Sequence, residues 1–358
     1  MCGRRSFLPD RATVGIVWPA VVLMICGIGS QALAQDPPKH PAVLSREFVY
    51  ETAPFKSCHA STLIETDAGP ACAFFAGDDE GEPNVEIWFT IRSGTSWSPV
   101  RSIATGVQPD GSRYPCWNPV LHREQNGTLT LFYKVGPSPS KWWGLYRQSA
   151  DGGSTWNEPV RLPDGILGPI KNKPMTLADG RLLCPSSDEE QGWVVRMETR
   201  SADGKNWSSS GPLNGSPKTG GLFDAIQPTI LRHPDNSLQI LCRTKQRVVA
   251  ESWSVDQGQT WSPLAATWLP NPNSGIDAVT LRDGRHLLVY NPTRVGRFPL
   301  SVAVSKDGKS WTDQVILDWL PGEYSYPAVI QQADGTVRLS YTWNRLKVRT
   351  VTLDPAKL

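Results

Sequence analysis

The chain has 358 residues, 39% of them hydrophobic, and a formal net charge of +2. A charge so near neutral argues against nucleic acid or a membrane surface as the partner, because both select strongly basic proteins. The fifteen tryptophans are a marked excess, which either core packing or stacking on carbohydrate explains.

Residues 1–34 have the features of a signal peptide. Several arginines precede an apolar run at 14–28, and small residues at 32–34 offer a cleavage point before Gln35. The apolar run is too short to indicate a membrane span. We therefore expect an exported protein, secreted or periplasmic, whose mature chain, 35–358, forms one domain.

One short motif recurs along the mature chain, with Ser, Asp, Gly and a final Trp in a fixed order. Its complete copies span 149–156, 201–207, 254–261 and 305–311, and a degraded copy without the Asp spans 93–97. The tryptophans are 50 to 59 residues apart, a period that indicates repeated supersecondary units. Asp and Gly are typical of a tight turn, and the Trp can pack between units. We therefore interpret these aspartates as structural.

A second repeat interleaves with the first. Each copy has a short apolar strand, and most copies continue through a turn such as Asp-Gly into a second strand, with no long helical period, which predicts an all-β fold. Six such units around an axis form a six-bladed β-propeller. We expect the strand at 46–50 to complete the blade that contains the strand at 346–353, because this closure removes an exposed edge.

The first residues of the six repeated strands predict a common site. The innermost strands of a propeller line its central channel, so residues that begin them should meet at one mouth. They are His59, Asn118, Lys173, Gln227, Asp277, and Tyr324 or Tyr326. A purely structural ring does not need such varied polar residues, so we predict that this mouth binds the substrate.

Five cysteines follow the predicted signal peptide, without CxxC spacing. Three of them lie in apolar runs and are expected to be buried. Cys58 and Cys116 both precede repeat strands, and a disulfide between them is one open pairing. The spacing of His, Cys and Asp does not match a zinc site, and we expect neither a metal nor an organic cofactor.

The Asp-boxes and the six units resemble the sialidase (neuraminidase) superfamily, specifically its BNR-repeat branch, over essentially the whole mature chain. The resemblance implies a glycoside hydrolase that holds a substrate carboxylate with arginines and attacks with a tyrosine. The segment that ends at Arg243 is similar to that of the second family arginine, and the segment that begins at Arg297 to that of the third. Tyr324 matches the nucleophile. Guanidiniums bind carboxylates bidentately, and tyrosine nucleophiles occur among glycosidases.

The chain departs from the family pattern in two places. His59-Ala60-Ser61 stands where the family has Arg-Ile-Pro, so the arginine clamp is incomplete or is rebuilt with His59. The carboxylate that polarises the tyrosine would fall at Ala225, beside Asp224. Glu251 and Asp277 are the other candidates.

The general acid implied by the resemblance lies in the acidic loop at 77–82. Asp79 and Glu80 are the candidates, although a solvated turn explains the loop equally well. The basic residues that could replace the missing arginine are Lys171, Lys173 and Lys245. Trp142 and Trp143 could stack on sugars or merely cover a blade edge.

Three functions fit these observations. The first is an exo-acting, sialidase-like hydrolase, expected to be a monomer, that releases a terminal acidic sugar from a glycan. The second is a polysaccharide lyase that acts on uronic-acid polymers, with His59 as base and Tyr324 or Tyr326 as acid. The third is a non-catalytic carbohydrate-binding propeller that has lost its first arginine.

Overall fold

The computed structural model describes residues 37–190, 192–214 and 221–358. The predicted signal peptide, residues 1–34, lies outside them. Asp36–Leu358 forms one compact unit, and nearly all of its regular structure is β-strand. Among the described residues, no helix is long and apolar enough to cross a membrane.

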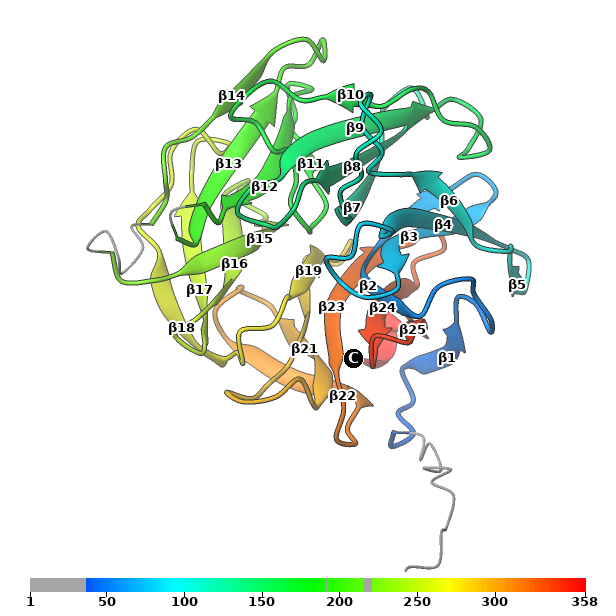
Figure 1. Ribbon diagram of the computed structural model, residues 1–358. Helices are drawn as coiled ribbons and strands as arrows, with labels where there is room; N and C mark the ends of the chain where they lie inside the picture. Colours follow the sequence, from blue (N-terminus) through cyan, green and yellow to red (C-terminus); the bar gives the residue numbers. More distant parts are fainter. Residues whose placement is uncertain (1–36, 191, 215–220) are drawn as a thin grey trace, which may run out of the picture. The chain divides into compact units, whose positions relative to one another are not determined.

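Six antiparallel sheets surround a common axis, which confirms the predicted six-bladed β-propeller (Figure 1). Blades 1 to 3 consist of β2 (Ser57–Thr66), β3 (Gly69–Gly77), β4 (Glu86–Ser93), β5 (Ser96–Trp97) and β6 (Arg101–Ala104); of β7 (Cys116–Arg123), β8 (Leu129–Val135), β9 (Trp143–Ser149) and β10 (Val160–Arg161); and of β11 (Met175–Thr176), β12 (Leu182–Asp188), β13 (Val194–Arg200) and β14 (Trp207–Ser209). Blades 4 to 6 consist of β15 (Ala225–Arg232), β16 (Leu238–Thr244), β17 (Val248–Ser254) and β18 (Ala265–Pro270); of β19 (Asp277–Thr280), β20 (His286–Tyr290), β21 (Leu300–Ser305) and β22 (Trp311–Asp318); and of β23 (Tyr324–Gln331), β24 (Val337–Trp343), β25 (Lys347–Leu353) and β1 (Val43–Phe48).

The ring closes within blade 6, as predicted. β1, from the start of the described chain, pairs antiparallel with β25, from its end, with Val43 opposite Leu353 and Phe48 opposite Arg349 (Figure 1). The pairing covers the edge that β25 would otherwise expose. A short 3-10 helix, η2 (Pro355–Lys357), follows β25.

The Asp-boxes are structural, as we interpreted them. In blade 2, Asp151 accepts hydrogen bonds from the Ser149 hydroxyl at 2.7 Å and from the backbone N–H of Thr155 at 2.8 Å. The ring of Trp156 packs edge-on against Phe89 of blade 1, with 5.7 Å between centroids. The complete boxes of blades 3 to 5 repeat the hydrogen bond from the Ser hydroxyl to the Asp carboxylate. Each complete box therefore closes a turn, and the box of blade 2 also fastens that blade to its neighbour.

Four of the inner strands carry a β-bulge close to their first residue. The ladder shifts register there, and one residue adopts a left-handed backbone that costs an L-residue about 1–2 kcal/mol. The four residues, with their φ angles, are Ala60 (52°), Asn118 (38°), Gln227 (56°) and Tyr326 (51°). The last three precede a proline. Because proline has no backbone N–H, the interruption of the ladder leaves no donor without a partner at that position. Bulges re-aim side chains, and these four lie at equivalent places around the channel.

The hydrophobic core is divided among the contacts between neighbouring blades. One cluster joins blades 5 and 6 through residues such as Val289, Leu300 and Tyr341. All five described cysteines are buried and free. The open pairing of Cys58 with Cys116 therefore does not form, and the Cys58 thiol instead accepts a hydrogen bond from the Tyr50 hydroxyl at 3.0 Å.

Candidate functional site

Tyr326 lies at the centre of a polar cluster at one mouth of the channel. Its hydroxyl accepts a hydrogen bond from Arg243 Nη1 at 2.8 Å and a longer one from Gln227 Nε2 at 3.4 Å. The imidazole of His59 packs on the ring with 4.1 Å between centroids, and the guanidinium of Arg297 lies 5.8 Å from the ring centroid. Residues from blades 1, 4, 5 and 6 therefore meet here, and His59, Gln227 and Tyr326 come together as predicted.

Arg243 is a buried cation whose hydrogen-bond acceptors are all neutral. It ends β16 near the mouth, and only 5% of it is exposed. It donates to the carbonyl oxygen of Asn273 at 2.6 Å, to the Oδ1 of the same residue at 2.8 Å and to Gln227 Oε1 at 3.1 Å, besides Tyr326. No ion pair joins Arg243 to a carboxylate in the described parts of the chain. Burial raises the pKa of the nearby Glu189 carboxylate and the charge of Arg243 partly offsets this rise, but Glu189 forms no ion pair with Arg243. A buried charge without a direct ion pair is costly, which points to an anionic ligand.

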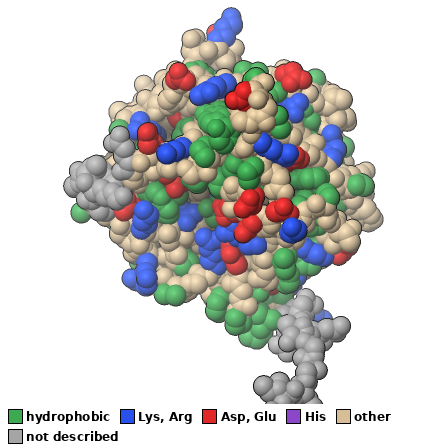
Figure 2. All heavy atoms as spheres, viewed as in Figure 1, with side chains coloured by type: hydrophobic (Ala, Val, Ile, Leu, Met, Phe, Trp, Pro, Cys, Tyr) green, Lys and Arg blue, Asp and Glu red, His purple; other side chains and the backbone are tan. Residues whose placement is uncertain are grey.

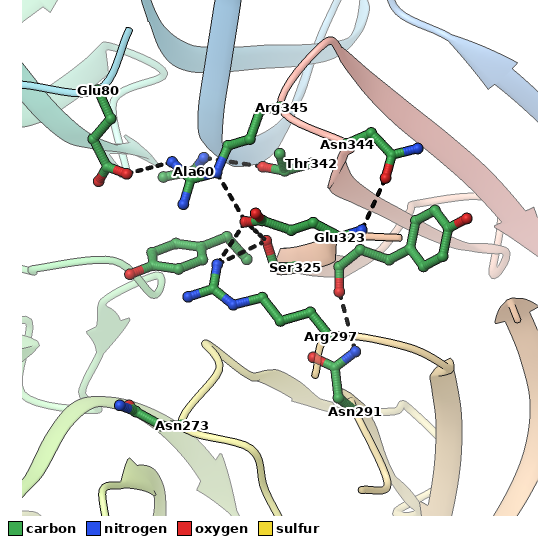
Figure 3. Close-up of polar contacts among 12 residues, drawn as sticks. Ala60, Glu80, Asn273, Asn291, Arg297, Glu323, Ser325, Thr342, Asn344 and Arg345 are labelled. Atoms are coloured by element: carbon green, nitrogen blue, oxygen red, sulfur yellow. Dashed lines mark hydrogen bonds and ion pairs between the residues drawn. The ribbon is translucent and has the colours of Figure 1, made fainter. Parts of the chain in front are cut away.

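Arg297 and Arg345 share one carboxylate, that of Glu323 (Figure 3). Arg297 Nη1 lies 2.6 Å and Arg345 Nε 2.8 Å from Glu323 Oε1, and the Ser325 hydroxyl donates to the same oxygen at 3.0 Å. Burial alone would raise the pKa of Glu323, but the charges of Arg297 and Arg345 outweigh it and hold that pKa below its usual value. Glu323 is therefore ionised, and it neutralises only part of the charge beside it.

Arg345 is a third guanidinium that the sequence did not reveal. It lies in the β24–β25 hairpin, and its carbonyl oxygen accepts the backbone N–H of Cys58 at 2.8 Å. Blade 6 adjoins blade 1 in the closed ring, so the hairpin tip reaches the first inner strand near Ala60 (Figure 3). The resemblance places the missing family arginine on that strand. The only sequence signal for Arg345 is a polar Asn-Arg pair between two strands.

The acidic loop also reaches the mouth. Asp79 and Glu80 line a hollow of about 490 Å³ together with Trp117, Pro139, Glu323 and Arg345. Glu80 forms an ion pair with Arg345. Asp79 accepts the backbone N–H of Glu80 at 2.8 Å and forms no ion pair among the described residues. On the face seen in Figure 2, basic and acidic side chains gather side by side near the middle.

The structure brings Tyr326, and not Tyr324, to the arginines. The Tyr324 ring is 4% exposed and packs into the apolar cluster between blades 5 and 6. Burial raises the pKa of its hydroxyl. Residues two apart share one side of an unbroken strand, but the bulge at Tyr326 breaks this alternation and separates the two hydroxyls.

Lys173 and Asp277 come together, but they bind each other. Lys173 Nζ lies 2.9 Å from both carboxylate oxygens of Asp277. Asp277 also accepts the Thr229 hydroxyl and the Val329 backbone N–H, each at 2.8 Å. The pair thus links blades 3 to 6. Asn118 occupies the equivalent bulge of blade 2 and is buried.

The other two lysines differ in their surroundings. Lys171 Nζ is buried below the Tyr326 ring and donates to Asn172 Oδ1 at 2.8 Å and to the Ile276 carbonyl oxygen at 2.9 Å. Burial lowers the pKa of Lys171 to about 7. Lys245 instead lies 4.5 Å from the centroid of the Trp193 ring.

Two of the carboxylates expected to polarise the tyrosine, Glu251 and Asp277, bond to other residues. Ala225 is apolar and buried, and Glu251 accepts hydrogen bonds from Gln239 and Trp253. Blade 4 presents two donors to the tyrosine hydroxyl, the guanidinium of Arg243 and the neutral amide of Gln227, and no carboxylate. No cluster of three or more His, Cys, Asp or Glu side chains suited to a metal ion occurs in the described chain.

Burial keeps His59 neutral. It lowers the pKa of the imidazole well below its usual value, and the charges of Arg345 and Arg297 lower that pKa further. Its Nδ1 is buried and has no hydrogen-bond partner among the described residues. His59 is thus a neutral imidazole packed against Tyr326.

The family described as "BNR repeat-like domain" matches residues 71–339, which is most of the propeller. This chain belongs to the BNR repeat-like family. Two curated relatives match this BNR repeat-like protein. They are the anhydrosialidase of Macrobdella decora, 26% identical over 264 residues (61% of this chain and 32% of the relative), and the sialidase of Micromonospora viridifaciens, 23% identical over 275 residues (67% and 41%). The BNR repeat-like protein thus spans less than half the length of either.

Solved structures share the fold of this BNR repeat-like protein at low identity. A Dyadobacter fermentans protein of unknown function has a TM-score of 0.73 at 17% identity, covering 87% of this chain and 98% of its own. The NanB sialidase of Streptococcus pneumoniae has a TM-score of 0.70 at 13% identity, covering 92% and 73%. The intramolecular trans-sialidase of Ruminococcus gnavus has a TM-score of 0.68 at 14% identity, covering 89% and 99%.

Proposed function

We propose that this protein is an exported glycoside hydrolase of the sialidase type that releases a terminal acidic sugar from glycans. The observation that carries the proposal is the buried Arg243, which has only neutral acceptors and donates to the hydroxyl of Tyr326. The curated relatives, a sialidase and an anhydrosialidase, support the reaction class. Residues 1–34 support export, and an exported chain that begins at Gln35 would test it.

The charge balance of the mouth favours an anionic ligand. Arg297 and Arg345 form ion pairs with the carboxylates of Glu323 and Glu80, whereas Arg243 forms no ion pair among the described residues and feels the charge of Glu189 only from a greater distance. All five N–H groups of Arg243 already have neutral acceptors, so this residue attracts an anion mainly through its charge. The remaining N–H groups of Arg297 and Arg345 can donate directly to a substrate carboxylate.

Tyr326 is the proposed nucleophile, in place of Tyr324. The donors on Arg243 and Gln227 stabilise negative charge that develops on the phenol oxygen as it passes its proton to the neutral imidazole of His59, which packs on the same ring, and attacks the anomeric carbon. The glycosidic C–O bond breaks in this step, and water then cleaves the bond between Tyr326 and the sugar. Asp79 is the proposed general acid, because it lines the same hollow without an ion pair and can protonate the leaving oxygen. Glu80 holds Arg345 in place.

Two observations favour a second candidate, the polysaccharide lyase. Gln227 cannot accept the phenol proton as a carboxylate would, and the imidazole of His59, packed on Tyr326, has an Nδ1 that bonds to no described residue and can accept a proton. In a lyase, His59 would take the proton from the carbon next to the uronate carboxylate. A carbon–carbon double bond would form, the glycosidic C–O bond would break, and Tyr326 would protonate the leaving oxygen.

One experiment separates these functions. The purified protein is incubated with sialosides and with uronate polysaccharides, while new reducing ends and ultraviolet absorbance are both recorded. A hydrolase produces reducing ends without absorbance, whereas a lyase produces both. Binding without either product would leave the non-catalytic propeller. Cleavage of neutral glycosides as fast as acidic ones would contradict the proposed role of the arginines.

A further inference from the structure

A pocket of about 590 Å³ lies between the inner strands of blades 3, 4 and 5, which are β11, β15 and β19 (Figure 1). Its walls include Arg232, which ends β15, whereas Gln227, near the start of the same strand, lies at the mouth. At about 3.3 Å per residue, the two residues are roughly 15 Å apart along the strand. The pocket shares no lining residue with the hollow of Asp79 and Glu80, and it is therefore separate from the mouth.

A large part of this wall is aliphatic. Met175, Ile230 and Val279 line the pocket from the three inner strands, one from each, and Leu281 lines it from the β19–β20 hairpin. Small-molecule sites in proteins have volumes of roughly 300–1,000 Å³ and are lined mainly by apolar side chains with a few polar groups. The pocket therefore has the size and the wall expected for an organic ligand with an apolar body.

The charged side chains in the wall are all cations. Lys173, Arg232 and Arg282 line the pocket, and no carboxylate among the described residues does so. Asp277 neutralises Lys173 through an ion pair at 2.9 Å. The charge of Arg282 contributes to lowering the pKa of Asp334, but these two residues form no ion pair, and Arg232 forms none within the described parts of the chain. The pocket therefore keeps a positive charge.

Arg232 also has hydrogen-bonding capacity left for a ligand. Its Nη2 donates to the carbonyl oxygen of Thr176 at 3.2 Å, which fixes the guanidinium against blade 3. Its Nε is buried and has no hydrogen-bond partner among the residues described. A buried donor without an acceptor is costly. Arg282 is exposed and donates to the carbonyl oxygens of Gln332 at 2.7 Å and Ala333 at 3.1 Å, which holds it at the rim.

We propose that this pocket binds a small organic monocarboxylate with an apolar body, such as an aromatic acid. The apolar body contacts the aliphatic wall, and Arg232 binds the carboxylate, while Arg282 adds positive charge from the rim. A guanidinium matches the planar carboxylate and donates to both of its oxygens. A neutral ligand would leave the charge of Arg232 unpaired, and a sugar would place its hydroxyls against aliphatic side chains. The site is independent of the reaction proposed for the mouth.

Calorimetric titration of the full chain with naphthalene-2-carboxylate tests this site. We expect saturable binding with a Kd no weaker than about 1 mM. Naphthalene-2-carboxamide has the same shape without the charge and should bind about tenfold more weakly, as should acetate, which lacks the apolar body. Arg232→Met and Arg282→Met should each weaken binding of the naphthoate about tenfold. Arg285→Met is the matched control, because Arg285 lies in the same hairpin as Arg282 but binds Asp283 and does not line the pocket.

The same titration with Arg243→Met distinguishes this pocket from the mouth. That variant should still bind the naphthoate, because Arg243 lies at the mouth. Circular dichroism shows whether each variant is folded, and if Arg232→Met is not, the exposed Arg282 decides the test. The inference is overturned if the naphthoate does not bind saturably, if the amide or acetate binds as tightly, or if binding is lost in Arg243→Met but survives in Arg282→Met.

Discussion

Replacing Arg243 by methionine tests whether the charge of this buried guanidinium binds the substrate. Methionine keeps much of the side-chain volume but removes the charge and every hydrogen bond that the guanidinium donates. Two effects on the fold oppose each other. The cost of burying a charge disappears, while acceptors on Asn273 and Gln227 lose their donors, at about 1–3 kcal/mol each where water cannot replace them. We therefore expect a folded protein with a small change in the free energy of unfolding.

The effect on activity should be much larger. The guanidinium carbon of Arg243 lies 5.5 Å from the centroid of the Tyr326 ring, where the substrate is proposed to bind. Two unit charges at about that distance attract each other by about 3 kcal/mol at an effective dielectric constant of about 20. Losing this attraction should lower kcat/KM for an acidic glycoside about a hundredfold.

The assay compares an acidic glycoside with its neutral methyl ester. Arg243→Met should lower kcat/KM for the acid and leave the low rate on the ester almost unchanged. Arg338→Met is the matched control, because Arg338 is 6% exposed but pairs with Glu47 at 3.1 Å. It should lower the free energy of unfolding by about 2–3 kcal/mol and leave kcat/KM per folded molecule intact. Wild-type activity in Arg243→Met, or a loss fully explained by unfolding, would refute the reasoning.

Three further predictions concern the tyrosines, the amide and a buried histidine pair. Tyr326→Phe should abolish turnover but keep binding, whereas Tyr324→Phe should keep turnover; the reverse result in kinetic and binding assays would return the nucleophile to Tyr324. Gln227→Glu gives the buried arginine a counter-ion, so calorimetry should show about tenfold weaker binding of an acidic sugar and unchanged binding of its ester; equal loss for both would contradict this. His286 donates to or accepts from His233 at 3.2 Å, and burial, together with that neighbour, lowers its pKa from 6.5 to about 4. Because the unfolded chain takes up this proton first, urea titrations should show the free energy of unfolding falling by about 2–3 kcal/mol between pH 6.5 and 4. A His286→Gln variant with the same pH dependence would rule out this group as the cause.

The architecture could be predicted because its signals are local and repeated. Each Asp-box is a turn within eight residues, and its period along the chain indicates repeated units. The six copies of the second repeat give the number of blades without knowledge of any long-range contact. The closure of β1 on β25 followed from two unpaired strands at the ends of the repeats. The sequence also indicated that residues near the starts of the inner strands lie close together, because strands that begin alike in every blade must begin near the same channel mouth.

Only the tertiary structure decided which side chains share the site. The bulge at Tyr326 turns that hydroxyl, and not that of Tyr324, toward Arg243. Arg345 reaches the mouth because ring closure places blade 6 beside blade 1, which brings together residues almost 290 positions apart. Asp277 begins an inner strand as predicted and Lys173 lies two residues before one, yet the two form an ion pair with each other. Local turn propensities act over a few residues and can be recognised in one repeat, whereas ion pairs depend on the three-dimensional distances that the closed ring sets.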